Sequence, residues 1–95
     1  MSNVALVTGG SRGIGAAVCR LLGAAGWAVG VNYRRDEAAA AGVVEAVRAA
    51  GGRAVAIRAD TAVEAEVKAM FATVDRELGP LDALVNNAAI ALRPA

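Results

Sequence analysis

The stretch "LVTGGSRGIGAAV", residues 6–18, is the strongest indication of how this chain folds. An apolar run leads into a turn with four glycines, and an apolar helix start follows the turn. Glycine adopts tight backbone angles and, because it lacks Cβ, lets peptide N–H groups approach a pyrophosphate closely. A helix that begins at such a turn also directs its positive end at the bound anion. The order strand, glycine turn, helix therefore predicts a dinucleotide-binding loop built on Gly9, Gly13 and Gly15.

Two other interpretations of this loop compete with that prediction. A plain strand-to-helix turn would be favoured if the loop held only a pair of glycines. A nucleoside-triphosphatase loop needs Gly-Lys followed by Ser or Thr, and the only lysine of the chain is Lys68. The triphosphatase interpretation is therefore excluded, and the number and spacing of the glycines favour dinucleotide binding over a plain turn.

The rest of the chain alternates between short apolar runs and segments with helical spacing. The apolar runs predict strands at Val4–Thr8, Trp27–Tyr33, Arg53–Ala59 and Asp82–Asn86. The intervening segments predict helices that begin near Gly13, Asp36 and Thr61 and end at Gly26, Ala50 and Leu78. This alternation predicts an α/β fold, a Rossmann-type doubly wound parallel sheet with right-handed crossovers. The expected strand order is 3-2-1-4, an incomplete version of that sheet.

Apolar residues recur at helical spacing in each helical segment, and we expect them to face the core. In the first helix they are Ile14, Val18, Leu21 and Leu22. In the second they are Ala40, Val43, Val44 and Val47. In the third they are Val63, Val67, Met70, Phe71, Val74 and Leu78. Asp36 is predicted to cap the second helix, and Thr61 with Glu64 matches a capping box for the third.

Doubly wound sheets bind ligands above the carboxyl ends of their strands, where the strand order reverses. The segments expected there are Thr8–Gly15, Tyr33–Asp36, Asp60 and Asn86–Ala89. Four loops are therefore predicted to converge on one crevice. The same strand order leaves Asp82–Asn86 at an open edge of the sheet, which predicts self-association or pairing with a missing C-terminal half.

The second loop predicts which cofactor is bound. In a dinucleotide fold, an acid about 20 residues beyond the glycines binds the ribose 2′-hydroxyl of NAD. Tyr33 occupies that position, and Arg34 and Arg35 follow it. A guanidinium group binds a 2′-phosphate through paired hydrogen bonds, whereas a carboxylate would repel it. The loop therefore predicts NADP rather than NAD; Asp36 is the counter-argument, but it comes late and fits better as a helix cap.

Composition narrows the class of protein further. Hydrophobic residues make up 57% of the 95 residues and aromatic residues 3%, so Ala, Val and Leu must fill the core of one small domain. The net charge is +1 with no basic cluster, which argues against nucleic-acid binding. The single cysteine, Cys19, excludes an internal disulfide and fits a reducing compartment. Because metal-ligand spacing and a membrane-length apolar stretch are absent from the sequence, we expect a cytoplasmic protein without a metal site.

Three motifs resemble those of the short-chain dehydrogenases/reductases. "TGGSRGIG" (residues 8–15) matches the family's T-G-x-x-x-G-x-G, and "ADT" (residues 59–61) matches the segment with its adenine-contacting Asp. "LDALVNNAA" (residues 81–89) is similar to its N-N-A-G motif, with Ala89 in place of the final Gly. The resemblance covers the whole chain. It implies that residues 1–95 are the N-terminal, cofactor-binding part of an NAD(P)-dependent oxidoreductase.

The resemblance also implies roles for individual residues. Ser11, Arg12 and Ile14 would contact the phosphates and ribose of the cofactor, and Asp60 would accept a hydrogen bond from the adenine amino group. The adenosine side would be lined by Asn86, Asn87 and Ala88. With the loop residues included, the predicted cofactor-binding set is Gly9, Ser11, Arg12, Gly13, Ile14, Gly15, Tyr33, Arg34, Arg35, Asp60, Thr61, Asn86, Asn87 and Ala88.

The catalytic residues of the family have no counterpart in this sequence. The resemblance implies a Ser, a Tyr-x-x-x-Lys pair and often an Asn, which transfer the proton and hold the substrate oxygen. The only tyrosine is Tyr33, followed four residues later by Glu37, and the only serines are Ser2 and Ser11. The parent activity would be hydride transfer between NADP(H) and a carbonyl or alcohol. We expect this chain alone not to catalyse that reaction. A catalytically inactive nucleotide-binding or interaction module, and a truncated gene product, are the alternatives.

Overall fold

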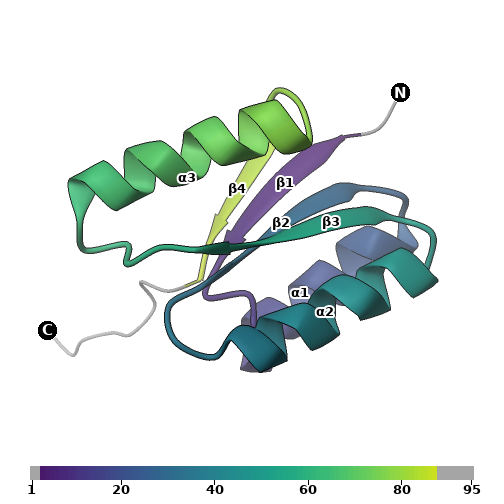
Figure 1. The fold of residues 1–95 in the computed structure, drawn as a ribbon. Helices are drawn as coiled ribbons and strands as arrows, with labels where there is room; N and C mark the ends of the chain where they lie inside the picture. The colour runs from purple at the N-terminus through teal and green to yellow at the C-terminus, as the bar shows by residue number, and fades with distance from the viewer. Residues whose placement is uncertain (1–2, 88–95) are drawn as a thin grey trace, which may run out of the picture.

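The computed structural model describes residues 3–87, in which strands and helices alternate as predicted (Figure 1). The strands are β1 (Val4–Thr8), β2 (Ala28–Tyr33), β3 (Arg53–Arg58) and β4 (Ala83–Asn86). The helices are α1 (Gly13–Ala24), α2 (Glu37–Ala49) and α3 (Glu64–Glu77). All pairings are parallel and the strand order is β3-β2-β1-β4, so the predicted Rossmann-type topology is confirmed.

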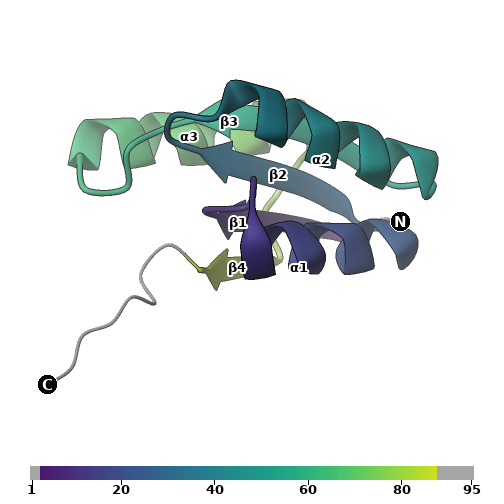
Figure 2. The same ribbon diagram turned by 90° about the horizontal axis from the view of Figure 1, so that it is seen from below.

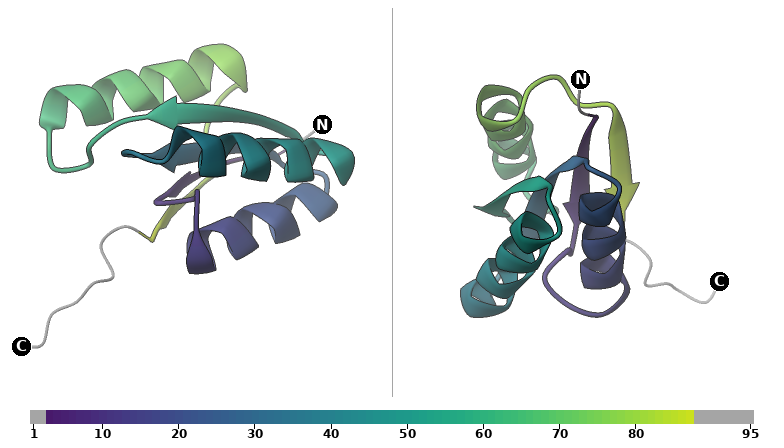
Figure 3. Two further views of the ribbon diagram at one scale, coloured as in Figure 1. Left: turned by 60° about the horizontal axis from the view of Figure 1, so that its bottom comes forward. Right: turned by 90° about the vertical axis from the view of Figure 1, so that its right-hand side faces the viewer.

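The helices cover the two faces of the sheet unequally. Helices α1 and α2 pack side by side on one face, and α3 lies on the other (Figures 1 and 2). The two views of Figure 3 show the same arrangement, with the sheet between the α1–α2 layer and α3. This asymmetry follows from right-handed crossovers that run in one direction from β1 to β3 and then reverse to reach β4. None of these helices is long and apolar enough to cross a membrane.

The sheet separates two apolar layers, as expected for a strand buried on both faces. On the α1–α2 side the buried residues include Val7, Val29, Val31 and Val47. On the α3 side they include Leu6, Ile57, Met70 and Val74. The five residues of β1 are all buried, because β1 lies between β2 and β4 and has helices on both faces.

The predicted inner face of α2 is confirmed, but those of α1 and α3 are wrong in part. Of the residues predicted for α1 only Val18 and Leu22 pack against the core, and Val63 and Phe71 of the α3 prediction are exposed. Ile14 and Leu21 are 73% and 72% exposed, and α1 instead buries small residues, namely Gly15, Ala16, Cys19 and Gly23. The reason is a close approach between α1 and its neighbours. A Cβ added at Gly23 would lie 2.8 Å from Cγ1 of Val47 on α2, so a larger residue there would push the helices apart.

The predicted helix caps had opposite outcomes. Asp36 caps α2 as predicted, because its Oδ1 accepts a hydrogen bond of 3.0 Å from the Ala39 N–H. The capping box of Thr61 and Glu64 is wrong, since α3 begins at Glu64 and Val63 is its N-cap residue. Asp60 forms the turn before α3 instead, with its Oδ1 accepting from the Ala62 N–H at 2.9 Å.

Candidate dinucleotide-binding site

The predicted phosphate loop lies at the carboxyl end of β1 and leads directly into α1. Gly9 and Gly13 have φ angles of 63° and 57°. Residues with a Cβ adopt this backbone conformation only with strain. Within residues 3–87 no side chain caps the N-terminus of α1, and its first turn holds no acidic residue. The first backbone N–H groups of α1 are therefore left for an anion from outside the helix.

Gly15 is required for the close contact between the loop and α1. A Cβ at this position would overlap the carbonyl oxygen of Gly9 and would lie 2.8 Å from Nδ2 of Asn87. Asn87 itself donates a hydrogen bond of 3.1 Å from Nδ2 to that carbonyl oxygen. The shape of the loop is therefore fixed from the β4 side as well as by its own glycines.

The last residue of β4, Asn86, and the residue after it, Asn87, both contact the β1 end of the site. Besides the bond from Asn87, the Oδ1 of Asn86 accepts a hydrogen bond of 3.1 Å from Oγ1 of Thr8. The register of the sheet places Thr8 directly opposite Asn86. The predicted positions Ala88 and Ala89 lie outside the described residues.

Asn32 contributes to the site, although its role was not predicted from the sequence. This residue of β2 is only 2% exposed, and its Oδ1 accepts a hydrogen bond of 3.1 Å from the Gly9 N–H. Its Nδ2 donates to the carbonyl oxygens of Ile57 and Ala59 at 3.3 and 3.1 Å. One buried amide therefore ties the phosphate loop to the ends of β2 and β3. The available signal was a polar residue near the end of an otherwise apolar strand, where a buried amide needs partners.

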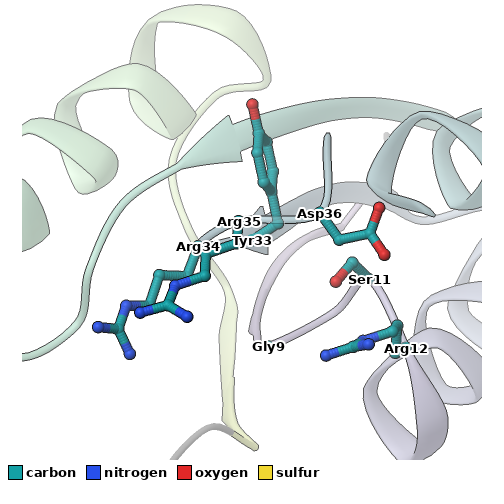
Figure 4. A pocket seen from close by; sticks show the side chains of 7 residues that line it. All are labelled: Gly9, Ser11, Arg12, Tyr33, Arg34, Arg35 and Asp36. Carbon is teal, nitrogen blue, oxygen red and sulfur yellow. The ribbon is translucent and has the colours of Figure 1, made fainter. Parts of the chain in front are cut away.

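The first two predicted loops border an open cavity of about 410 Å³. Its lining consists of Gly9, Ser11, Arg12, Tyr33, Arg34, Arg35 and Asp36. Figure 4 shows Ser11 and Arg12 on one side of this cavity and Arg34 and Arg35 on the other, with the Tyr33 ring directed away from them. Three guanidinium groups thus border the cavity against one carboxylate, that of Asp36, which is already bonded to the α2 N-terminus.

The remaining predicted residues lie at different distances from this cavity. Asp60 does not line it, but its Oδ2 is 3.6 Å from Nε of Arg34, so the end of β3 is joined to the cavity through an ion pair. Thr61 and Asn86 line a second cavity of about 200 Å³ beside α3 and β4. Ile14 is exposed on α1 and borders neither cavity. The four loops therefore share one edge of the sheet but not one cavity.

Cys19 is a core residue and no part of the site. It is fully buried, and burial raises the pKa of its thiol to about 12, an effect that the nearby Arg20 charge opposes. The thiol is therefore protonated at neutral pH and unsuited to nucleophilic chemistry. Across residues 3–87 no three potential metal ligands of the His, Cys, Asp or Glu type come together.

A parallel sheet of order 3-2-1-4, with a glycine loop after β1 and an uncapped helix N-terminus beside it, defines an α/β fold of the Rossmann type. The chain matches the short chain dehydrogenase family over residues 3–95 and belongs to that family.

The chain is similar to curated proteins that are named as an oxidoreductase, a reductase and a short-chain dehydrogenase/reductase homolog. It is 49% identical over 87 residues to "Uncharacterized oxidoreductase YgfF" of Escherichia coli (strain K12), covering 92% of this chain and 35% of that protein. It is 47% identical over 90 residues to the 3-oxoacyl-[acyl-carrier-protein] reductase FabG of Staphylococcus aureus (strain Mu50 / ATCC 700699), covering 95% and 37%. "Short-chain dehydrogenase/reductase homolog YusS" of Bacillus subtilis (strain 168) is 42% identical over 90 residues, covering 95% of this chain and 83% of that protein.

Solved structures give the same result. A short-chain dehydrogenase/reductase from Serratia marcescens superposes with a TM-score of 0.86 and 44% identity, over 90% of this chain and 35% of that one. A putative dehydrogenase from Burkholderia cenocepacia with bound NADP superposes with a TM-score of 0.86 and 32% identity, over 90% and 33%. The chain thus spans about a third of the length of YgfF, of FabG and of these two solved structures, whereas YusS is a relative of similar length.

Proposed function

We propose that this chain binds NADP(H) as the cofactor-binding part of a short-chain dehydrogenase/reductase. The parent activity would be hydride transfer between NADP(H) and a carbonyl or alcohol substrate. The observation that carries the proposal is the cavity between the phosphate loop and the end of β2, which Arg12, Arg34 and Arg35 border. These guanidinium groups supply the paired donors and the charge that a 2′-phosphate requires.

The main objection to NADP is the carboxylate of Asp36, which lines the same cavity. A carboxylate at this loop would bind the two ribose hydroxyls of NAD and repel a 2′-phosphate. The hydrogen bond from the Ala39 N–H to Asp36 Oδ1 weakens the objection, because it directs this charge to the N-terminus of α2. The relative from Burkholderia cenocepacia with bound NADP also supports this choice.

In the proposed binding mode the pyrophosphate lies against the glycine loop and the N-terminus of α1. Ser11 and Arg12 then contact phosphate or ribose from the cavity wall, and the backbone at Ile14 contributes from the first turn of α1. At the adenosine end, Asp60 accepts from the adenine amino group and Thr61 lies beside it. The adenosine side is lined by Asn86, Asn87 and Ala88. The side chain of Asn87 also holds the loop in shape through its hydrogen bond to the Gly9 carbonyl oxygen.

A second candidate function is a nucleotide-binding or interaction module without catalysis. The 95 residues contain no Tyr-x-x-x-Lys pair. Their only serines are Ser2 and Ser11, and Ser11 belongs to the phosphate loop. A curated relative of similar length, YusS, favours this candidate over a truncated product with no stable role. Reading the codons after Ala95 separates the candidates, because a downstream Ser and Tyr-x-x-x-Lys would assign the chain to a longer enzyme. The cytoplasm remains the proposed compartment, supported by the single cysteine.

Arg34→Asp tests the cofactor proposal directly. We expect the wild-type chain to bind NADPH more tightly than NADH, and Arg34→Asp to lose that discrimination by about 10- to 100-fold, since a charge-assisted contact contributes about 1.5–3 kcal/mol. The measurement is a fluorescence titration of both nucleotides at one ionic strength. Unchanged discrimination in the variant would show that the 2′-phosphate is not bound at this loop.

A further inference from the structure

Arg34 and Asp60 stand at the ends of neighbouring strands, β2 and β3, and their side chains form an ion pair. The distance from Nε of Arg34 to Oδ2 of Asp60 is 3.6 Å. The two residues belong to different parts of the proposed binding mode, since Arg34 would bind the 2′-phosphate and Asp60 the adenine. The guanidinium of Arg34, which borders the cavity, is therefore already paired with the carboxylate of Asp60, which lies outside the cavity.

The Asp60 side chain is held by a hydrogen bond, whereas the Arg34 side chain is mostly exposed. The Oδ1 of Asp60 accepts from the Ala62 N–H at 2.9 Å, and its own backbone N–H donates to Oε1 of Glu66 at 2.8 Å. These bonds leave Oδ2 as the atom that faces Arg34. The Asp60 side chain is 27% exposed and the Arg34 side chain 60% exposed, so a ligand can draw Arg34 away while Asp60 stays.

In the described part of the chain, the other two guanidinium groups of the cavity have no such partner. Within residues 3–87 neither Arg12 nor Arg35 forms an ion pair. Glu66, the carboxylate that accepts from the Asp60 N–H, pairs with Arg58 rather than with a cavity residue. A 2′-phosphate that enters the cavity therefore meets two unpaired guanidinium groups and a third for which it must compete with Asp60.

We propose that Asp60 is a specificity-determining residue of this site, which lowers the preference for a 2′-phosphorylated cofactor by competing for the guanidinium of Arg34. This inference rests on the proposed function. A cofactor with a 2′-hydroxyl leaves the ion pair intact, and one with a 2′-phosphate must break it. An ion pair this exposed shifts the preference by about two- to fivefold, the range for surface pairs.

Asp60→Asn isolates this effect with little structural change. Asn keeps Oδ1 as the acceptor for the Ala62 N–H and for adenine, and replaces the charged Oδ2 with an amide that repels Arg34 Nε–H. Glu66→Gln is the matched control, because it removes one charge from the same corner and keeps Oε1 as the acceptor for Asp60. Arg34→Gln, alone and combined with Asp60→Asn, completes a double-mutant cycle.

The measurement is the ratio of the dissociation constants of 5′-ADP and 2′,5′-ADP for the 95-residue chain, by calorimetry at low salt. We expect Asp60→Asn to raise this ratio about two- to fivefold, to leave it unchanged in the Arg34→Gln background, and to exceed the effect of Glu66→Gln. Three results would overturn this inference but not the proposed function. They are an unchanged ratio in Asp60→Asn, an equal change in Glu66→Gln, or the same rise of the ratio when Asp60→Asn is combined with Arg34→Gln. A wild-type chain that binds neither nucleotide would overturn the proposed function and this inference with it.

Discussion

The side-chain amide of Asn87 donates a hydrogen bond of 3.1 Å to the carbonyl oxygen of Gly9, which joins two segments that lie 78 residues apart in sequence. Gly15 lies against the same carbonyl oxygen and the same amide. The phosphate loop is therefore clamped between β4 and the first turn of α1. Its shape depends on a long-range contact as well as on glycine.

Replacing Gly15 with alanine tests this clamp. The added Cβ would overlap the Gly9 carbonyl and lie 2.8 Å from Asn87 Nδ2, so the loop must shift. We expect a loss of about 1–3 kcal/mol in the free energy of unfolding, as for other overpacked sites, together with weaker nucleotide binding. Urea denaturation and a nucleotide titration measure the two effects.

Gly42→Ala is the matched control for that substitution. Gly42 lies in the exposed middle of α2, and an added Cβ there would meet nothing within 4 Å. The same chemical change should stabilise the chain by about 0.5–1 kcal/mol, because alanine favours helix over glycine. Equal effects of the two substitutions would show that the contact at Gly15 is unimportant.

Asn32→Leu tests the buried amide that joins the loop to β3. Leucine has a similar size but cannot donate to the carbonyl oxygens of Ile57 and Ala59 or accept from the Gly9 N–H. Because each buried polar group left without a partner costs about 1–3 kcal/mol, we expect a fall of about 3 kcal/mol in the free energy of unfolding. Asn3→Leu, the same change at an exposed position, should have little effect. Similar losses from both variants would contradict the role given to Asn32.

The buried thiol of Cys19 predicts a pH dependence of stability. Burial raises its pKa in the folded chain to about 12, above the value of 9.0 for a free thiol, so the folded state holds the proton more tightly than the unfolded state. This contribution is fully present below about pH 9 and is lost as the pH rises towards 12. Relative to Cys19→Ala, the wild-type chain should lose about 1 kcal/mol of stability between pH 8 and pH 10. A difference between the two proteins that is the same at both pH values would contradict this prediction.

The open edge of β4 predicts self-association of the chain. Within the described sheet β4 pairs only with β1, and Leu84 on β4 is 49% exposed beside Phe71 of α3. Unpaired backbone groups next to exposed apolar side chains favour pairing with another strand. We expect Leu84→Lys to reduce association in light scattering, and Leu21→Lys, at an exposed position on α1, to leave it unchanged. A wild-type chain that stays monomeric at all concentrations would contradict the prediction.

The sequence predicts the sheet and α2 well, because their signals come from large apolar side chains. Val43 and Val47 recur at helical spacing and are buried as predicted. The buried face of α1 could not be found this way, since it consists of glycine, alanine and cysteine, while the larger Ile14 and Leu21 are exposed. The bonds made by Asn32 depend on which strands are neighbours and in which register, and hydropathy does not carry that information.

The cavity at the ends of β1 and β2 is proposed to bind a 2′-phosphorylated dinucleotide. The most direct measurement is a calorimetric titration of the purified 95-residue chain with NADP⁺ and with NAD⁺ at one salt concentration, with Gly13→Val as the loop control. We predict that NADP⁺ binds about 10- to 100-fold more tightly than NAD⁺, and that Gly13→Val, which forces a branched residue to a φ of 57°, weakens both. Equal affinities for the two nucleotides, or binding that survives Gly13→Val unchanged, would contradict the claim.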